Sequence, residues 1–232
     1  MLNRILYVGA AIVLSVSVAQ SQQALTDQPE QPESKHIFWI IPNFRTAPLP
    51  ANYVPLTDGE KFNVAAEDAF DRGTFALAAA FGGQSQLAND NRSFGQGAAG
   101  FGRYFGTAYG DLVIGDYMTE AILPVLLHQD PRYFRRGTGT GWSRLGYAIE
   151  QSFWTRSDSG GMQFNYSEIA GNSTAVAISM AYYPGSRTAS DALSQLGAQV
   201  GVDMAANIVK EFWPNGGRKR GKHAGGSQVS RE

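Results

Sequence analysis

Hydrophobic and polar positions follow a helical period from Thr57 onward. In the last such segment Leu193, Leu196, Val200, Met204 and Ile208 form one apolar ridge, the spacing typical of a helix packed on a core. Because such segments alternate with capping signals, we expect an all-α domain of about five helices, at residues 58–81, 94–128, 141–155, 166–182 and 189–212.

The helix starts are predicted by residues whose side chains can accept from free backbone N–H groups. Thr57-x-x-Glu60, Ser93-x-x-Gln96 and Asn165-x-x-Glu168 fit or resemble a capping box, and Thr188-x-x-Asp191 is a weaker relative. Pro124 falls inside the second segment, so we expect a kink near Glu120, whose carbonyl loses its hydrogen-bond partner.

Small residues recur every four positions in two of the helices. They are Ala98, Gly102, Gly106 and Gly110, and then Gly197, Gly201 and Ala205. Each glycine costs about 1 kcal/mol relative to alanine in a helix, so the stripes predict faces where another helix approaches closely. The resulting picture is a compact bundle with Gly/Ala-rich faces, which could also join two copies of the chain.

The stretch GQGAAG at residues 95–100 matches the G-x-G-x-x-G spacing of dinucleotide-binding loops. That function requires a strand before the glycines, but QLANDNRS is polar and broken. We therefore interpret the stretch as the start of a long helix capped by Ser93 and Gln96, and we predict no cofactor.

The ends of the chain differ from the helical domain, which we place at 57–214. Residues 1–19 have the basic, apolar and small-residue regions of a cleaved signal peptide. Residues 20–56 read as a Pro-rich linker followed by an apolar strap, HIFWIIPNF, with Phe38, Trp39 and Ile41 buried. The Gly-rich basic stretch 215–232 is predicted to be a disordered tail.

Charge and cysteine content narrow the function classes. The chain has no cysteine, so neither disulfides nor a lipid-modified N-terminal cysteine can form. The 57–214 domain has 11 basic and 16 acidic residues, whereas the tail has five basic and one acidic. A basic tail can contact anionic lipid, and an exported chain is not expected to meet nucleic acid.

Candidate catalytic chemistry is restricted to one segment. Asp116 and Glu120 share a helix face, and His128 and Asp130 follow in LLHQDPRYFRR. Carboxylates with an imidazole could act in acid–base chemistry. The motifs of helical metal sites are absent, so we predict no metal. The alternative is that Asp130-Pro131 forms a turn and His128 helps to cap the helix.

Arginines near aromatic residues are the candidate ligand-binding groups: Arg103, Arg132, Arg135, Arg136 and Arg156. Guanidinium groups could bind phosphate or carboxylate headgroups. In the competing interpretation, these arginines compensate the partial negative charge at helix C-termini or pair with acidic side chains. Two polar pairs, Glu168/Asn172 and Asp203/Asn207, are expected to form buried hydrogen bonds between helices or to line a polar cavity.

The motifs FGQGAAGFGRYFG, QDPRYF, TRSDSGG followed by FNYSEIAGN, AYYP and EFWP cover residues 95 to 214. Together they resemble an uncharacterised family of exported bacterial proteins. The resemblance implies export and a single domain, without an assigned activity or functional residue.

The leading hypothesis is an exported cell-envelope protein, periplasmic or associated with the outer membrane. It would be a non-enzymatic helical module. Its partner would be either a membrane surface, with anionic lipid as the ligand, or another protein of the envelope. One alternative is an envelope hydrolase that uses His128 with nearby carboxylates. The other is a membrane-embedded helical or barrel assembly.

Overall fold

The computed structural model describes residues 35–37, 41–50, 52–182 and 188–213. The predicted signal peptide and basic tail lie outside the described residues, as do Phe38, Trp39 and most of the Pro-rich linker. The side chain of Ile41 is likewise not described, so the predicted burial of these three side chains stays a prediction.

The described chain is mainly helical, with short strands. Its helices are α2 (Asp58–Ala69), α3 (Arg72–Ala88), the 3₁₀ turn η1 (Arg92–Phe94), α4 (Gly97–Asp116), the π-helix η2 (Tyr117–Ile122), α5 (Leu123–Leu127), α6 (Gly141–Glu150), α7 (Tyr166–Tyr182) and α8 (Ala189–Phe212). Its strands are β1 (His36–Ile37), β2 (Ile41–Pro42), β3 (Thr46–Pro48), β4 (Tyr133–Arg135), β5 (Trp154–Arg156) and β6 (Met162–Phe164).

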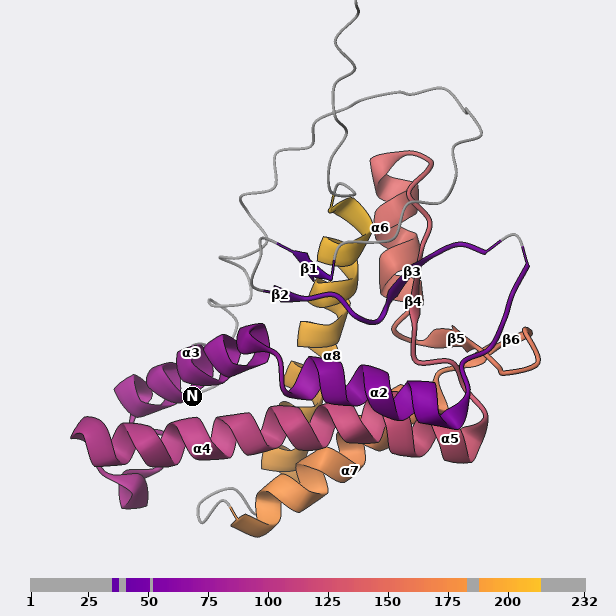
Figure 1. Ribbon diagram of the computed structural model, residues 1–232. Coiled ribbons are helices and arrows are strands. Elements are labelled where there is room, and N and C mark those ends of the chain that lie inside the picture. Colours follow the sequence, from indigo (N-terminus) through magenta and orange to yellow (C-terminus); the bar gives the residue numbers. More distant parts are fainter. Residues whose placement is uncertain (1–34, 38–40, 51, 183–187, 214–232) are drawn as a thin grey trace, which may run out of the picture.

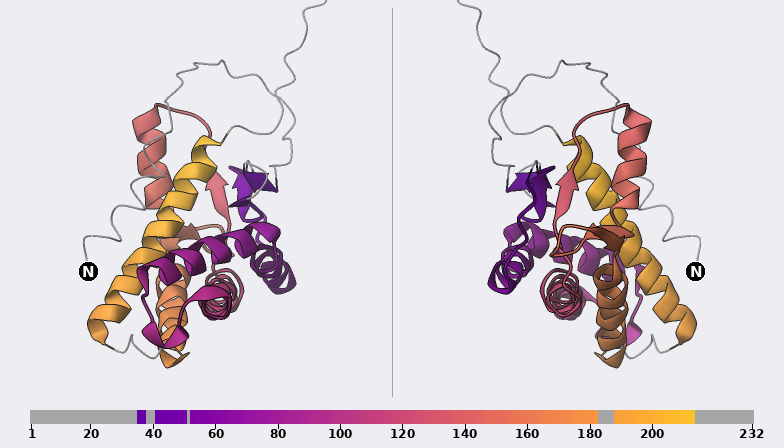
Figure 2. Two further views of the ribbon diagram at one scale, coloured as in Figure 1. Left: turned by 90° about the vertical axis from the view of Figure 1, so that its left-hand side faces the viewer. Right: turned by 90° about the vertical axis from the view of Figure 1, so that its right-hand side faces the viewer.

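A central rod organises the bundle. Helices α4, η2 and α5 run on without interruption, and α2, α3 and α7 all pack against this rod (Figure 1). Helix α8 crosses the bundle and packs on α7 and α6 (Figure 2). The all-α compact bundle predicted from the sequence is confirmed, with six helical stretches in the described residues in place of about five.

Two predicted helix bounds are wrong because local hydrogen bonds end the helices early. The segment 58–81 is two helices, since Asp71 Oδ1 accepts from the backbone N–H of Gly73 at 2.6 Å and caps a new helix. The segment 141–155 ends at Glu150, after which the chain enters the β5–β6 hairpin. The bounds predicted for α7 and α8, including the Thr188–Asp191 capping box, are confirmed.

The disturbance expected before Pro124 takes the form of the π-helix η2. The backbone N–H of Leu123 bonds to Met118 O, five residues back, so the backbone widens over the turn before the proline. Glu120 lies in this widened turn and is 2% exposed. The π-helix therefore directs an acidic side chain into the bundle.

The glycines of GQGAAG form the turn that begins α4. Gly95 and Gly97 both have φ +74°, and a Cβ on Gly100 would lie 2.4 Å from Gly95 O. The predicted cap by Ser93 and Gln96 is wrong, because Ser93 donates from its backbone to Asn91 Oδ1 and Gln96 makes no side-chain cap.

The prediction that the small-residue stripes are closely packed is also wrong within the described chain. A Cβ on Gly102, Gly106, Gly197 or Gly201 would meet no described atom within 4 Å. Close helix approach occurs instead at Gly82, where a Cβ would lie 2.8 Å from Phe105 Cα, and at Gly171, against Met118 and Thr119. Ala98, Gly102, Gly106 and Gly197 are exposed, whereas Gly110, Gly201 and Ala205 are half-buried.

The strap before α2 joins the bundle through short strands. β1 and β2 form an antiparallel hairpin, and β3 pairs in parallel with β4. Ile37 is buried, and Arg45 between β2 and β3 reaches the acidic side chains inside the bundle. The strap thus supplies a cation to a core that contains few large apolar residues.

Candidate functional site

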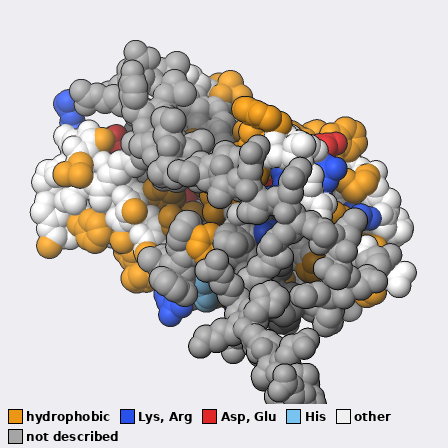
Figure 3. All heavy atoms as spheres, turned by 90° about the horizontal axis from the view of Figure 1, so that it is seen from above, with side chains coloured by type: hydrophobic (Ala, Val, Ile, Leu, Met, Phe, Trp, Pro, Cys, Tyr) orange, Lys and Arg blue, Asp and Glu red, His pale blue; other side chains and the backbone are white. Residues whose placement is uncertain are grey.

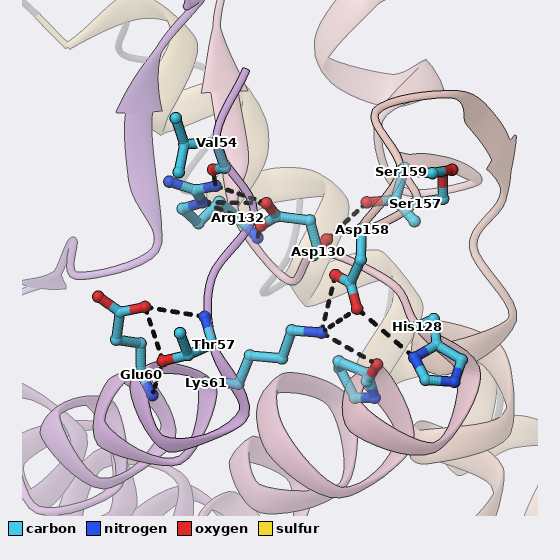
Figure 4. A network of polar contacts seen from close by, with 12 residues as sticks. Val54, Thr57, Glu60, Lys61, His128, Asp130, Arg132, Ser157, Asp158 and Ser159 are labelled. Carbon is cyan, nitrogen blue, oxygen red and sulfur yellow. Dashed lines mark hydrogen bonds and ion pairs between the residues drawn. The ribbon is translucent and has the colours of Figure 1, made fainter. Parts of the chain in front are cut away.

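His128 and Asp130 belong to a polar network where α5 ends (Figure 4). His128 has φ 53° and a side chain 83% exposed, and its Nδ1 lies 3.8 Å from Asp158 Oδ2. Lys61 Nζ, fully buried, donates to both oxygens of Asp158 at 2.8 Å. Asp130 instead accepts from Arg132 and from Tyr53 Oη. The two predicted catalytic neighbours therefore have different partners.

Asp116 and Glu120 lie in a separate cluster inside the bundle. Glu120 Oε1 is bound by Arg45 Nε at 3.0 Å, and Asp68 Oδ2 lies 3.9 Å from the same nitrogen. Glu120 contacts Arg45, whereas His128 contacts Asp158. The Glu120 carboxyl group and the His128 imidazole therefore belong to different networks. The structure thus does not bring the four candidates into one site.

The core cluster links six segments of the chain. Its members are Arg45 before β3, Asp68 of α2, Asp116 of α4, Glu120 of η2, Glu168 and Asn172 of α7, and Asp203 and Lys210 of α8. Asn172 Nδ2 donates to Glu168 Oε1 at 3.2 Å and to Asp203 Oδ2 at 3.1 Å. The predicted polar link between these two helices is confirmed. Asn207 donates instead to Ser152 Oγ.

Burial dominates the acid–base behaviour of this cluster. It raises the pKa values of Glu120, Glu168 and Asp116 well above their ordinary range, and neighbouring acids add to the effect. Burial lowers the pKa of Lys210. Burial also opposes the charge on Arg45, but Glu120 and the other carboxylates outweigh it and raise the pKa of Arg45. The core therefore favours protonated carboxyl groups beside a charged arginine.

The space beside this cluster is small. A polar cavity of about 20 Å³ is lined by Arg45, Glu168, Asp203 and Asn207 among others, and it has room for about one water molecule. In the part of the chain that the structure describes, no three His, Asp or Glu side chains are arranged as a metal site.

The candidate arginines mostly make internal contacts. Arg132 and Arg156 lie over the rings of Tyr53 and Phe134, with the Arg132 and Arg156 Cζ atoms 5.1 and 5.4 Å from the Phe134 centroid. Arg135 Nε donates to Glu211 O, and Arg136 Nη1 donates to Ser143 Oγ. Arg103 is exposed and donates to Phe94 O. The partners in these contacts are aromatic rings, backbone carbonyls and a hydroxyl group. Pairing with an acid, as in the competing interpretation, is observed for Arg132, whose guanidinium binds the Asp130 carboxylate at 2.6 Å.

The surface of the α3–α4 hairpin was not singled out from the sequence. We define the hairpin surface as the exposed apolar side chains Phe75, Phe81 and Leu87 of α3 and Phe101 of α4. Leu87 is 90% exposed and Phe75 54% exposed. Phe75 contacts Phe105 edge to face, with ring centroids 4.7 Å apart, and Phe101 stacks on Phe105 with centroids 6.1 Å apart. Figure 3 shows hydrophobic side chains over this end of the molecule, at the left.

A signal for this surface does exist in the sequence. Residues 73–88 contain no Asp, Glu, Lys or Arg, and residues 97–110 contain only Arg103. A helical hairpin with four phenylalanines and a single charged residue in these two ranges indicates an unpartnered apolar element. The glycine stripes of the sequence predicted close helix packing instead.

No helix in the described ranges is both long and apolar enough to cross a membrane. Comparison with models of known protein families, with curated proteins and with solved structures found no match to this chain.

Proposed function

We propose that this protein is an exported, non-enzymatic envelope module that docks on a membrane surface through the α3–α4 hairpin. The observation that carries the proposal is the hairpin surface, where large apolar side chains face outward on an element with few charged residues. Exposed apolar patches of this kind are characteristic of docking sites.

The arrangement of the side chains favours lipid over a protein partner. Phe81 and Leu87 lie six residues apart on α3, so they project from different sides of the helix. A protein partner covers one face and adds a polar rim with hydrogen bonds, whereas a lipid phase surrounds an inserted element and requires no polar complement. The free end of the hairpin also protrudes from the bundle (Figure 1).

Lipid contact through this surface would be mainly apolar. Residues 71–110 contain Arg72, Arg92 and Arg103 against Asp71 and Asp90, a net charge of only +1. Anionic headgroups therefore gain little from the hairpin itself, and any preference for them would come from the basic residues of 215–232. The anionic-lipid contact expected from the sequence thus becomes a separate, salt-sensitive contribution.

Vesicle flotation of the mature chain with Leu87→Glu tests the proposal. Insertion of a leucine side chain contributes about 1.5–3 kcal/mol, so its loss should lower the vesicle-bound fraction about tenfold or more on neutral phospholipid vesicles. The matched control is Leu126→Glu, because Leu126 is 67% exposed at the opposite end of the rod.

Equal loss of binding in the two variants, or no binding by the parent chain, would contradict docking by the hairpin. Binding to anionic vesicles that disappears at high salt, and is insensitive to Leu87→Glu, would assign the contact to basic residues instead.

A further inference from the structure

The acids of the core, of which Asp68, Glu120 and Glu168 are buried and Asp116 and Asp203 half-buried, outnumber its cations. Five carboxyl groups face two cations, Arg45 and Lys210; the acids are Asp68, Asp116, Glu120, Glu168 and Asp203. With every group ionised, the interior would carry three uncompensated negative charges. Such an arrangement is very costly inside a protein unless protons or cations reduce the charge.

Arg45 brings two of these carboxyl groups together. Its Nε lies 3.0 Å from Glu120 Oε1 and 3.9 Å from Asp68 Oδ2. Ionised carboxylates only accept hydrogen bonds, so neither acid of this pair can donate to the other unless one of them is protonated.

Two buried oxygens independently indicate the missing proton. Asp68 Oδ1 and Glu120 Oε2 have no hydrogen-bond partner among the described residues, although Glu120 is 2% and Asp68 7% exposed. Buried polar atoms are nearly always satisfied. A proton on either carboxyl group of this pair provides the donor that both lack.

We propose that the core is a proton-binding site in which the carboxyl pair Asp68–Glu120 holds one proton at neutral pH. The groups that face this pair are Arg45 from the strap, Asp71 after α2, Asp116 from α4 and Lys210 from α8. Arg45 binds Glu120 and neutralises one of the remaining charges.

The Asp68–Glu120 pair joins the base of the hairpin to the rod. Asp68 precedes the α3 cap Asp71 by three residues, and Glu120 lies in the π-helix that continues α4. Loss of the proton would place two carboxylates side by side and push α2 away from the rod. The site therefore links proton binding to the attachment of the hairpin, and it does not depend on membrane docking.

Infrared spectroscopy of the full mature chain tests the proposal directly. At neutral pH the parent should show carbonyl absorption from protonated carboxyl groups, and this absorption should disappear as the pH is raised. Glu120→Gln and Asp68→Asn should each remove part of it, because the amide supplies the hydrogen-bond donor in place of the protonated acid.

Glu60→Gln is the control, since the exposed Glu60 carboxylate caps α2 through Thr57 and has no carboxyl partner. It should leave the absorption unchanged. If the core variants do not fold, the pH series of the parent chain alone decides the matter. Absence of the absorption at neutral pH, or its removal by added Ca²⁺ or Mg²⁺, would overturn the proton assignment.

Discussion

Glu211 is a fully buried carboxylate that holds the last turn of α8 against β4 and α6. It accepts from Tyr133 Oη at 2.7 Å, from the backbone N–H groups of Arg136 and Gly137, and from Arg144 Nε at 2.8 Å. The Arg144 guanidinium also lies over Phe212, 4.5 Å from its centroid. Every donor here is directed at one side chain.

Glu211→Gln should lower the free energy of unfolding by about 3–5 kcal/mol, because the amide cannot accept from all four donors and leaves Arg144 unpaired. Tyr133→Phe removes a single donor and should cost about 1.5–3 kcal/mol. Urea denaturation at neutral pH measures both. A loss below about 1 kcal/mol for Glu211→Gln would show that this carboxylate does not hold the helix end.

At the scale of elements, the glycine positions differ in whether they have room for a side chain. Glycines at closely packed helix faces have no room for a Cβ, whereas glycines at open faces do. Gly82→Ala would place a Cβ 2.8 Å from the backbone of α4, so α3 and α4 must separate, and we expect a loss of about 1–3 kcal/mol. Gly106→Ala meets nothing described within 4 Å and should stabilise the helix by about 0.5–1 kcal/mol. Thermal unfolding of the two variants provides the measurement.

The glycine pair also tests the predicted self-association. If the small-residue stripes join two copies of the chain, Gly106→Ala should reduce dimerisation in analytical ultracentrifugation rather than stabilise the monomer. Stabilisation without a change in mass would leave the stripe as exposed helix surface.

Helix starts could be predicted from the sequence where a capping motif comes directly before residues with a helical hydrophobic period. Thr188 and Asp191 fixed the start of α8, and Thr57 and Glu60 that of α2. The break between α2 and α3 was not predicted, because the hydrophobic pattern continues across Phe70, Asp71 and Arg72. The Asp71 cap of α3 uses Gly73 two residues on, which the four-residue capping box does not describe.

The core cluster could not be assembled from the sequence because its members come from distant segments. Arg45, Glu120 and Lys210 are far apart in the chain, and only the tertiary fold brings them together. The polar pairs on α7 and α8 were visible as a local pattern, since four-residue spacing puts both side chains on one helix face. The position of Arg45 beside the same small cavity as Glu168, Asp203 and Asn207 was not visible in the sequence.

For the whole molecule, the raised pKa values predict stability that falls as the pH rises. Burial raises the pKa values of Asp68, Glu120 and Glu168, so between 4.5 and the raised values the folded state holds more protons than the unfolded state. Their contribution to stability is complete below the ordinary pKa values and is lost as the pH rises through the raised ones. Urea midpoints should therefore decrease from about pH 5 to about pH 8.

The pKa of Asp71 is shifted in the opposite direction. Burial opposes its charge, but the hydrogen bond from His36, the bonds from the backbone N–H groups of Gly73 and Arg72, and the charge of His36 together outweigh burial and lower the pKa of Asp71 below 3.8. Its contribution is present above 3.8 and is lost as the pH falls through the lowered value. Maximum stability is therefore expected in the mildly acidic range. A midpoint that rises steadily to pH 8 would contradict the raised values in the core.

The central claim, that the hairpin enters the lipid, can be tested most directly by a label at its end. Because the chain has no cysteine, Leu87→Cys provides a unique attachment site for an environment-sensitive fluorophore, and Leu126→Cys provides its counterpart at the other end of the rod. With phospholipid vesicles, the label at position 87 should shift to the blue and be quenched by bilayer-embedded quenchers, while the label at 126 should not change. Equal responses at both positions, or none at 87, would contradict the claim.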